Sequence, residues 1–245
     1  MAAPEIPGQL NAAERRLLTE AITLAPRKPE VLIEVGTWLG GGSTLHILRA
    51  IEKNGTGHLW GVEADRSTYE RMLANIRAGA PEAANRFTPL FGFSQDVLAQ
   101  WKKEQGPGAR VDFAFLDGGN NPREQIDEFR LLDPLIPVGG QLMAHDAKAR
   151  KGRWLVPFIS HLDNWETRFH DVSDEGLFYG KKVAPAPSGG SLRAAKRRLF
   201  QQECNPVEIA ATLLPARVCG FCLDLLPRRF ARRLSDGRDI GAAPP

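Results

Sequence analysis

The chain has 245 residues, 42% hydrophobic and 25% charged, a composition typical of a globular protein with one main domain. Its net charge of +3 is uneven: residues 185–245 hold ten Lys or Arg against five acids, which leaves the first 184 residues at −2. No secretory signal is evident, and no stretch reaches the roughly 18 uncharged apolar residues of a membrane span. Because all three cysteines follow residue 203, we expect a cytoplasmic protein without a disulfide framework.

Helices and strands are predicted to alternate through most of the chain. Residues 11–23 have helical spacing of apolar positions, with Asn11 placed as the N-cap. A strand at 31–35, a glycine-rich turn and a helix at 43–53 follow. The same pattern then recurs, with strands at 58–63, 87–91, 111–116 and 140–144 and helices at 67–78, 95–103, 122–132 and 154–161. Each parallel pair of strands needs a crossover, so this alternation favours a parallel sheet with helices on both faces.

The last two strands are expected to run antiparallel. Segments 166–172 and 176–182 face each other across a short polar turn. The predicted fold class is therefore α/β: a Rossmann-like, doubly wound, mostly parallel seven-stranded sheet with an antiparallel β-hairpin at its C-terminal edge. We divide the chain into an N-terminal helical segment at 1–28, a cofactor-binding domain at 29–184, and a linker with a basic helical or disordered tail at 185–245.

Polar and glycine residues follow the first two strands, where a ligand binds in an open α/β sheet. Glu34, Gly36, Gly40 and Gly42 surround the first turn, and Glu63 ends the second strand, where it could accept hydrogen bonds from ribose hydroxyls. A nicotinamide dinucleotide usually needs G-x-G-x-x-G, which places pyrophosphate on a helix N-terminus. The spacing here differs, and a carboxylate precedes the turn. A cationic nucleoside fits better, and S-adenosylmethionine carries an ammonium and a sulfonium but no phosphate.

The ends of the three following strands complete a set of motifs. These are Gly92-Phe-Ser94-Gln95, Phe115-Leu116-Asp117-Gly118-Gly119-Asn120 and Gly139-Gly140-Gln-Leu-Met-Ala-His145-Asp146. With them, residues 30–182 resemble the small O-methyltransferases of the class I superfamily, both the catechol type and the branch of cephalosporin hydroxylase-like and sugar O-methyltransferases.

The resemblance implies a role for each motif residue in binding S-adenosyl-L-methionine. The residues matched to the methionine end of the cofactor are Glu34, Gly36, Thr37, Gly40 and Ser43. Glu63 matches the acid that binds the ribose, and Ser94 and Gln95 match the pair at the adenine edge. Asp117 matches an acid near the cofactor.

The resemblance also implies a catalytic site that a divalent cation, Mg²⁺ or Mn²⁺, could assist. Asp117, His145 and Asp146 match its catalytic and metal-binding positions. The chain has Asn120 where relatives place a lysine or histidine base, so the base is unassigned. His145 stands where relatives favour an oxygen ligand; it could bind a metal or, without one, act as the base. Alternatively, Asp117 could cap the helix that begins near residue 122, and His145 could be a hydrogen-bonded strand-end histidine.

The predicted activity is methyl transfer to a hydroxyl of a small molecule, with no clear nucleic-acid site and with a homodimer left open. A catalytically inactive cofactor-binding module or partner subunit is the alternative outside enzymes. A nicotinamide-dependent oxidoreductase is disfavoured by the glycine spacing and by the absence of a Tyr-x-x-x-Lys pair. Trp38, Trp154 and Trp165 are interpreted as packing residues, although Trp154 could border an acceptor pocket.

Overall fold

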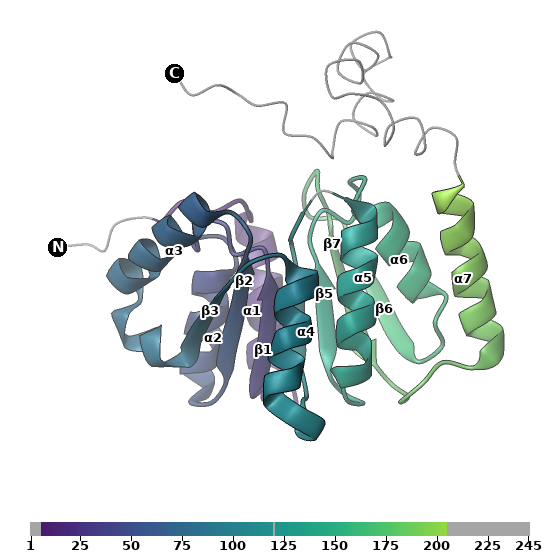
Figure 1. The fold of residues 1–245 in the computed structure, drawn as a ribbon, viewed down its shortest axis with the longest axis horizontal. Helices are drawn as coiled ribbons and strands as arrows, with labels where there is room; N and C mark the ends of the chain where they lie inside the picture. Colours follow the sequence, from purple (N-terminus) through teal and green to yellow (C-terminus); the bar gives the residue numbers. More distant parts are fainter. Residues whose placement is uncertain (1–5, 120, 205–245) are drawn as a thin grey trace, which may run out of the picture.

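One mixed sheet organises the chain in the computed structural model, which describes residues 6–119 and 121–204 (Figure 1). Within these residues the strand order is β3-β2-β1-β4-β5-β7-β6. The strands are β1 (Val31–Val35), β2 (His58–Glu63), β3 (Phe87–Phe91), β4 (Phe113–Leu116), β5 (Gln141–Ala144), β6 (Trp165–His170) and β7 (Leu177–Lys182). The five strands β1 to β5 run parallel, whereas β7 pairs antiparallel with both β5 and β6. The predicted fold class is confirmed.

The order of the strands creates a switch point between β1 and β4. The chain builds outward from β1 through β2 to β3, then returns to place β4 on the other side of β1. In the register, Val35 at the end of β1 lies beside both Val62 of β2 and Leu116 of β4. The residues that follow these strands therefore meet at one edge of the sheet, the usual ligand site of such folds.

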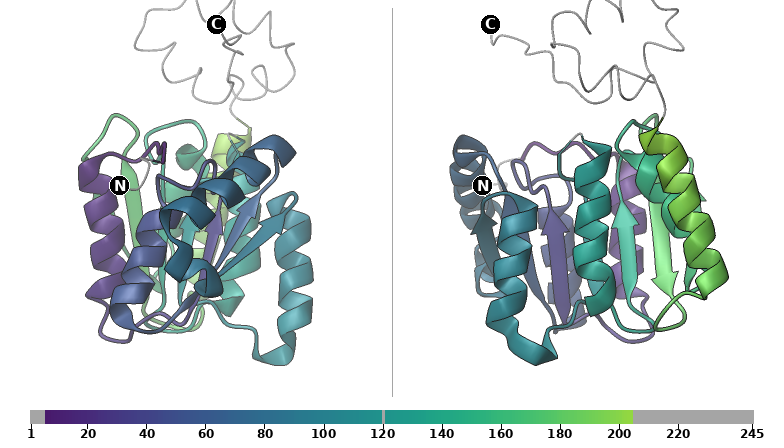
Figure 2. Two further views of the ribbon diagram at one scale, coloured as in Figure 1. Left: turned by 90° about the vertical axis from the view of Figure 1, so that its left-hand side faces the viewer. Right: turned by 45° about the vertical axis from the view of Figure 1, so that its right-hand side comes forward.

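Helices cover both faces of the sheet (Figures 1 and 2). They are α1 (Ala12–Thr23), α2 (Thr44–Asn54), α3 (Arg66–Gly79), α4 (Ser94–Gln105), α5 (Pro122–Leu132), α6 (Gly152–Ser160) and α7 (Gly189–Glu203), with short 3-10 helices at Pro81–Arg86, Gly106–Gly108 and Asp133–Leu135. One apolar core lies under α1, α2 and α3, and a second lies under α4 to α7. Because both faces are covered, β4 and β5 are buried along their whole length.

Local capping signals set several helix ends. The Asn11 side chain accepts a hydrogen bond from the Glu14 backbone N–H, and Glu14 accepts one from the Asn11 N–H, a complete capping box. Helix α5 begins at Pro122, and its N-cap is Asn121, whose side chain accepts from the Arg123 N–H. The alternative that Asp117 caps this helix is therefore wrong.

The segment before α1 lies against the glycine turn. A Cβ atom on Gly41 would come within 2.1 Å of the Ile6 carbonyl oxygen, and one on Gly8 within 2.3 Å of the Gly42 nitrogen. Real Cβ atoms do not approach other atoms so closely, so glycine is needed at both positions. The close approach brings Gln9 to the same edge of the sheet as the strand ends.

The described part of the chain ends with α7, which packs beside α6. Ala195 and Leu199 of α7 are buried in the same core as Leu155 and Ile159 of α6. The predicted boundary at residue 184 stays a prediction, and the predicted tail beyond residue 204 lies outside the described residues. Among the described helices, none combines the length and the apolar character needed to cross a membrane.

Candidate active site

A cavity of about 470 Å³ lies at the switch-point edge of the sheet. This volume is within the range of small-molecule sites, roughly 300–1,000 Å³. The residues that line the cavity include Gln9, Gly36, Trp38, Glu63, Ser94, Gln95, Asp117, Glu128, Asp146 and Lys151. They come from the ends of five different strands, from α5 and from the segment before α1.

The turn after β1 depends on glycine at two positions, for different reasons. Gly36 has φ +87°, and a Cβ atom there would lie 2.3 Å from the Asp117 carbonyl oxygen, so only glycine lets β1 and β4 end side by side. Gly40 has φ +85°, and its Cβ would meet Ile76 of α3 at 3.0 Å. Gly36 thus serves the close approach of β1 to the residues after β4 and also lines the cavity, whereas Gly40 serves the packing of α3 against the turn.

Trp38 occupies an unusual place in the same turn. Its φ of +46° is rare for a bulky residue, and its side chain is 39% exposed and borders the cavity. Trp154 and Trp165 are buried, as expected of packing residues. The packing interpretation is therefore correct for those two residues and wrong for Trp38.

Glu34, the last residue but one of β1, is completely buried beneath the turn. Burial raises the pKa of its carboxyl group to about 8; the hydroxyls of Ser43 and Thr44 lower the pKa, and the carboxylates of Asp117 and Glu63 raise it further. Those hydroxyls approach Glu34, yet neither carboxyl oxygen has a well-formed hydrogen bond to the described residues. Glu34 is therefore mostly protonated at neutral pH, and a nearby cationic ligand would favour its ionised form.

Glu63, at the end of β2, is held by backbone donors. Its Oε2 accepts from the Trp38 N–H at 2.9 Å, and its Oε1 accepts from the N–H groups of Ala64 and Asp65 at 3.0 Å each. These contacts fix the orientation of the carboxylate at the cavity wall. A carboxylate has about four acceptor positions, so Glu63 keeps one, on Oε2, for a hydroxyl group in the cavity.

Ser94 and Gln95 begin α4 and both line the cavity. The Ser94 hydroxyl donates to Glu128 Oε1 at 2.6 Å, so Ser94 is joined to an acid on α5. Burial raises the pKa of Glu128 to about 7, against the lowering effect of Ser94. The other carboxyl oxygen of Glu128 is buried and has no hydrogen-bond partner among the described residues.

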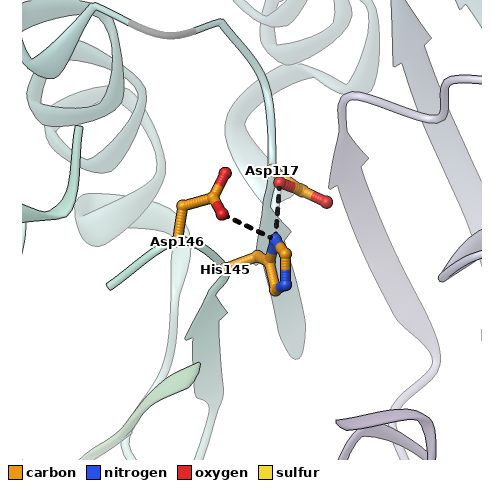
Figure 3. Close-up of side chains that lie close together, drawn as sticks. All are labelled: Asp117, His145 and Asp146. Carbon is orange, nitrogen blue, oxygen red and sulfur yellow. Dashed lines mark hydrogen bonds and ion pairs between the residues drawn. The ribbon is translucent and has the colours of Figure 1, made fainter. Parts of the chain in front are cut away.

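The strand-end acids and His145 come together, as the sequence predicts. In Figure 3 the imidazole of His145 points between two carboxylates, its Nδ1 lying 3.3 Å from Asp117 Oδ1 and 3.4 Å from Asp146 Oδ1. The other ring nitrogen, Nε2, lies 3.3 Å from Oε1 of Glu14, a buried residue of α1. Asp146 has φ +56°, a strained conformation for a residue other than glycine.

A lysine occupies the centre of this cluster. Nζ of Lys151, the residue before α6, lies 2.9 Å from Asp117 Oδ1 and 2.6 Å from Asp146 Oδ2, and it donates to the Gly118 carbonyl oxygen at 3.2 Å. By distance alone, Asp117, His145 and Asp146 could hold a cation, since their ligand atoms lie within 4.8 Å of one another. In the observed arrangement these three residues do not fit a metal ion, because an ammonium and an imidazole already contact the carboxylate oxygens.

The charges in this cluster stabilise one another. Burial disfavours a charged His145, but its interactions with Asp117, Asp146 and Glu14 outweigh burial and raise the pKa to about 12. For Asp146, burial is opposed by His145 and Lys151, which hold the pKa well below its usual range. For Lys151, burial is likewise outweighed by Asp117 and Asp146, which raise the pKa. At neutral pH the cluster is therefore an ionic network with both cations protonated.

Not all of the predicted site residues reach the cavity. Those that line it are Gly36, Glu63, Ser94, Gln95, Asp117 and Asp146; those that do not are Glu34, Thr37, Gly40, Ser43 and His145. The structure places the second group directly behind the wall, in or beneath the turn and the ion cluster. Asn120, named as the departure at the expected base position, lies outside the described residues.

The sequence interpretation did not identify three acid or base groups at this site: Glu14, Glu128 and Lys151. Glu14 had a local signal, because Asn11-x-x-Glu14 is a capping-box pattern. Glu128 lies on the apolar face of α5, where an acid is unusual. Lys151 had no distinguishing signal, since it is one of several basic residues in the segment at 148–153.

The fold and these strand ends define an α/β domain with a cavity at its switch point, the usual ligand site of such folds. The family model described as a methyltransferase domain matches residues 33–147, from β1 to just beyond β5. Over these residues the chain is similar to a methyltransferase domain. No curated protein matches the chain in sequence.

Solved structures with the same fold include several methyltransferases. A protein from Klebsiella pneumoniae assigned as an O-methyltransferase superposes with a TM-score of 0.59 at 17% identity, over 73% of this chain and 84% of that one. An O-methyltransferase from Bacillus cereus in complex with SAH (S-adenosylhomocysteine) gives 0.55 at 18% identity, over 74% and 84%. A methyltransferase from Geobacter sulfurreducens gives 0.56 at 18% identity, over 71% and 80%. At these identities the likeness establishes the fold.

Proposed function

We propose that the protein transfers the methyl group of S-adenosyl-L-methionine to a hydroxyl oxygen of a small molecule. The observation that carries the proposal is one cavity that joins the Gly36 turn and Glu63 on one side to Asp117 and Asp146 on the other. The first pair suits a nucleoside and the second suits a polar acceptor. The family match to a methyltransferase domain and the SAH complex of the Bacillus cereus relative support the choice of cofactor.

Each cofactor group has a candidate partner in the first half of the cavity. Glu63, held by three backbone N–H groups, would accept from a ribose hydroxyl through Oε2. Gly36 lets the ligand approach the backbone, and Ser94 and Gln95 would lie at the adenine edge. Glu34, beneath the turn, would become ionised near the methionine ammonium and add an electrostatic attraction.

The acceptor would bind on the β4 and β5 side. Asp146 lines the cavity with its side chain 22% exposed, so it can accept a hydrogen bond from an acceptor hydroxyl and orient the oxygen. The cofactor supplies a methyl group already activated by sulfonium. The new O–C bond forms as the S–C bond breaks, the electron pair stays on sulfur, and the hydroxyl proton leaves to a base or to water. Holding the reactants in line in this way can lower the activation free energy by roughly 7–11 kcal/mol.

The geometry does not favour His145 as the base. Each of its ring nitrogens faces a carboxylate, and its pKa is raised to about 12, so it carries both protons at neutral pH. A base must have a free site to accept a proton. The role of His145 supported by its contacts is to hold Asp117 and Asp146 in place.

The test is transfer of a labelled methyl group. The full-length protein is incubated with isotopically labelled S-adenosylmethionine and a panel of hydroxylated metabolites, and products are identified by mass spectrometry. The expected result is one class of product that gains one labelled methyl group on oxygen, with SAH formed in equal amount. SAH binding without transfer to any member of the panel would favour the alternative, a cofactor-binding module.

A further inference from the structure

The ammonium of Lys151 fills the position between the two strand-end carboxylates. Its three hydrogens have three acceptors, Asp117 Oδ1, Asp146 Oδ2 and the Gly118 carbonyl oxygen. Only 3% of the side chain is exposed, so water does not compete for these donors. The ammonium thus binds β4 and β5 together at the point where each strand ends.

A divalent cation would have to displace this ammonium. Mg²⁺ and Ca²⁺ bind oxygen ligands at about 2.0–2.6 Å, and both carboxylates already hold Nζ of Lys151 at hydrogen-bond distance. His145 Nδ1 also faces Asp117 Oδ1 and Asp146 Oδ1, so three of the four carboxylate oxygens already contact a cationic side chain. Moving a buried ammonium away from both of its partners would leave it unpaired, which is strongly unfavourable.

We infer that the Lys151 ammonium takes the place of a divalent cation in this site, so that methyl transfer by this protein needs no metal. This inference rests on the proposed function. Lys151 is a positioning residue, since all three of its hydrogens are used within the protein. It acts through Asp146, whose carboxylate borders the cavity and whose backbone is held at φ +56°.

The network extends beyond the cavity to the N-terminal helix. His145 lies between the two strand-end acids and Glu14 of α1, and Glu14 in turn accepts from the Ser173 hydroxyl at 2.5 Å. Two cations therefore face three carboxylates, all from described residues. A site that already holds two positive charges attracts a further divalent cation far less than three bare acids would.

The experiment measures Mn²⁺ binding to the full-length protein by electron paramagnetic resonance and calorimetry. The variants are Lys151→Ala, which opens the position between the carboxylates, Asp146→Asn, and the two substitutions combined. The control is Lys148→Ala, which removes a partly exposed lysine that donates to the Ser173 carbonyl oxygen in the same loop region. Methyl transfer and SAH binding are measured on the same preparations, with and without a chelator.

We expect Lys151→Ala to bind Mn²⁺ at least tenfold more tightly than the wild type, and the double variant to lose that gain. Wild type and Lys148→Ala should show equally weak binding, and a chelator should leave wild-type activity unchanged. Saturable Mn²⁺ binding by the wild type that Asp146→Asn abolishes, or loss of wild-type activity with chelator, would overturn the inference. Mn²⁺ binding and activity of the wild type test the inference even if Lys151→Ala does not fold. Failure of SAH binding would instead refute the proposed function.

Discussion

The acidic side chains in the two halves of the cavity have different partners. On the β1 and β2 side, Glu63 is oriented by backbone N–H groups and no side-chain cation contacts it in the described structure. On the β4 and β5 side, Asp117 and Asp146 are already paired with Lys151 and His145. The first half is ready for a ligand that brings its own donors and positive charge. The second half is electrostatically complete, so it can orient an acceptor without an added cation.

The largest predicted effect is a loss of stability when the ammonium of Lys151 is removed from the β4 and β5 side of the cavity. Lys151→Met leaves Asp117 and the partly exposed Asp146 without their shared ammonium, and removing one partner of a largely buried ion pair costs about 3–5 kcal/mol. Urea denaturation at neutral pH measures the free energy of unfolding. Lys148→Met is the control; it removes a partly exposed lysine that pairs with Asp171 and should change this free energy by no more than about 1 kcal/mol. Equal effects of the two variants would show that the ammonium of Lys151 is not held as described.

The next largest effect is on the binding of SAH at the β1 and β2 side of the cavity. Glu63→Ala removes the predicted acceptor of a ribose hydroxyl, and a hydrogen bond to a charged group contributes about 1.5–3 kcal/mol. We expect the Kd for SAH to rise about 100-fold, which corresponds to about 2.7 kcal/mol. Calorimetric titration measures it, with Glu70→Ala on the exposed side of α3 as the control. An unchanged Kd in Glu63→Ala would remove Glu63 from the binding site.

The free energy of unfolding should depend on pH through Glu34, the buried acid beneath the turn. The pKa of Glu34 is about 8 in the folded protein, against an ordinary glutamate value of 4.5. Between these values the unfolded chain binds fewer protons, so the contribution of Glu34 makes the protein less stable as the pH rises. Glu34→Gln lacks this effect. As the pH rises from 5.5 to 7.5, the unfolding free energy of the variant should therefore increase relative to that of the wild type by about 1 kcal/mol per pH unit. Parallel stability curves for the two proteins would contradict the raised pKa.

The smallest effect is expected at the contact between α4 and α5. Ser94→Ala removes the hydrogen bond to Glu128, and a single bond of this kind contributes about 1 kcal/mol. Thermal unfolding measures the loss, with Ser67→Ala on the exposed surface of α3 as the control. A loss no larger than that of the control would mean that the Ser94 hydroxyl bond does not stabilise the fold.

The sequence predicts the fold and the first half of the site because both depend on local patterns. Strands at 58–63 and 87–91 and the helix at 122–132 are found at the predicted residues, since periodicity and flanking Pro or Gly residues mark their ends. The Gly36 turn is recognisable because its positive φ requires glycine.

The second half of the site depends on contacts between distant residues. Lys151 and Asp117 are 34 positions apart, and Glu14 and Ser173 are 159 positions apart. Which of the two lysines in the loop after β5 turns inward, Lys148 or Lys151, is decided by the path of that loop and by the burial of α6. The sequence therefore predicts that the two acids and His145 meet, but not that an ammonium lies between them.

The most direct test of the central claim is a calorimetric titration of the full-length protein with SAH and, separately, with NADH. We expect binding of one SAH per chain, weakened in Glu63→Ala, and no binding of NADH. Binding of NADH with no response to SAH would contradict the assignment of the cavity to a sulfur nucleoside.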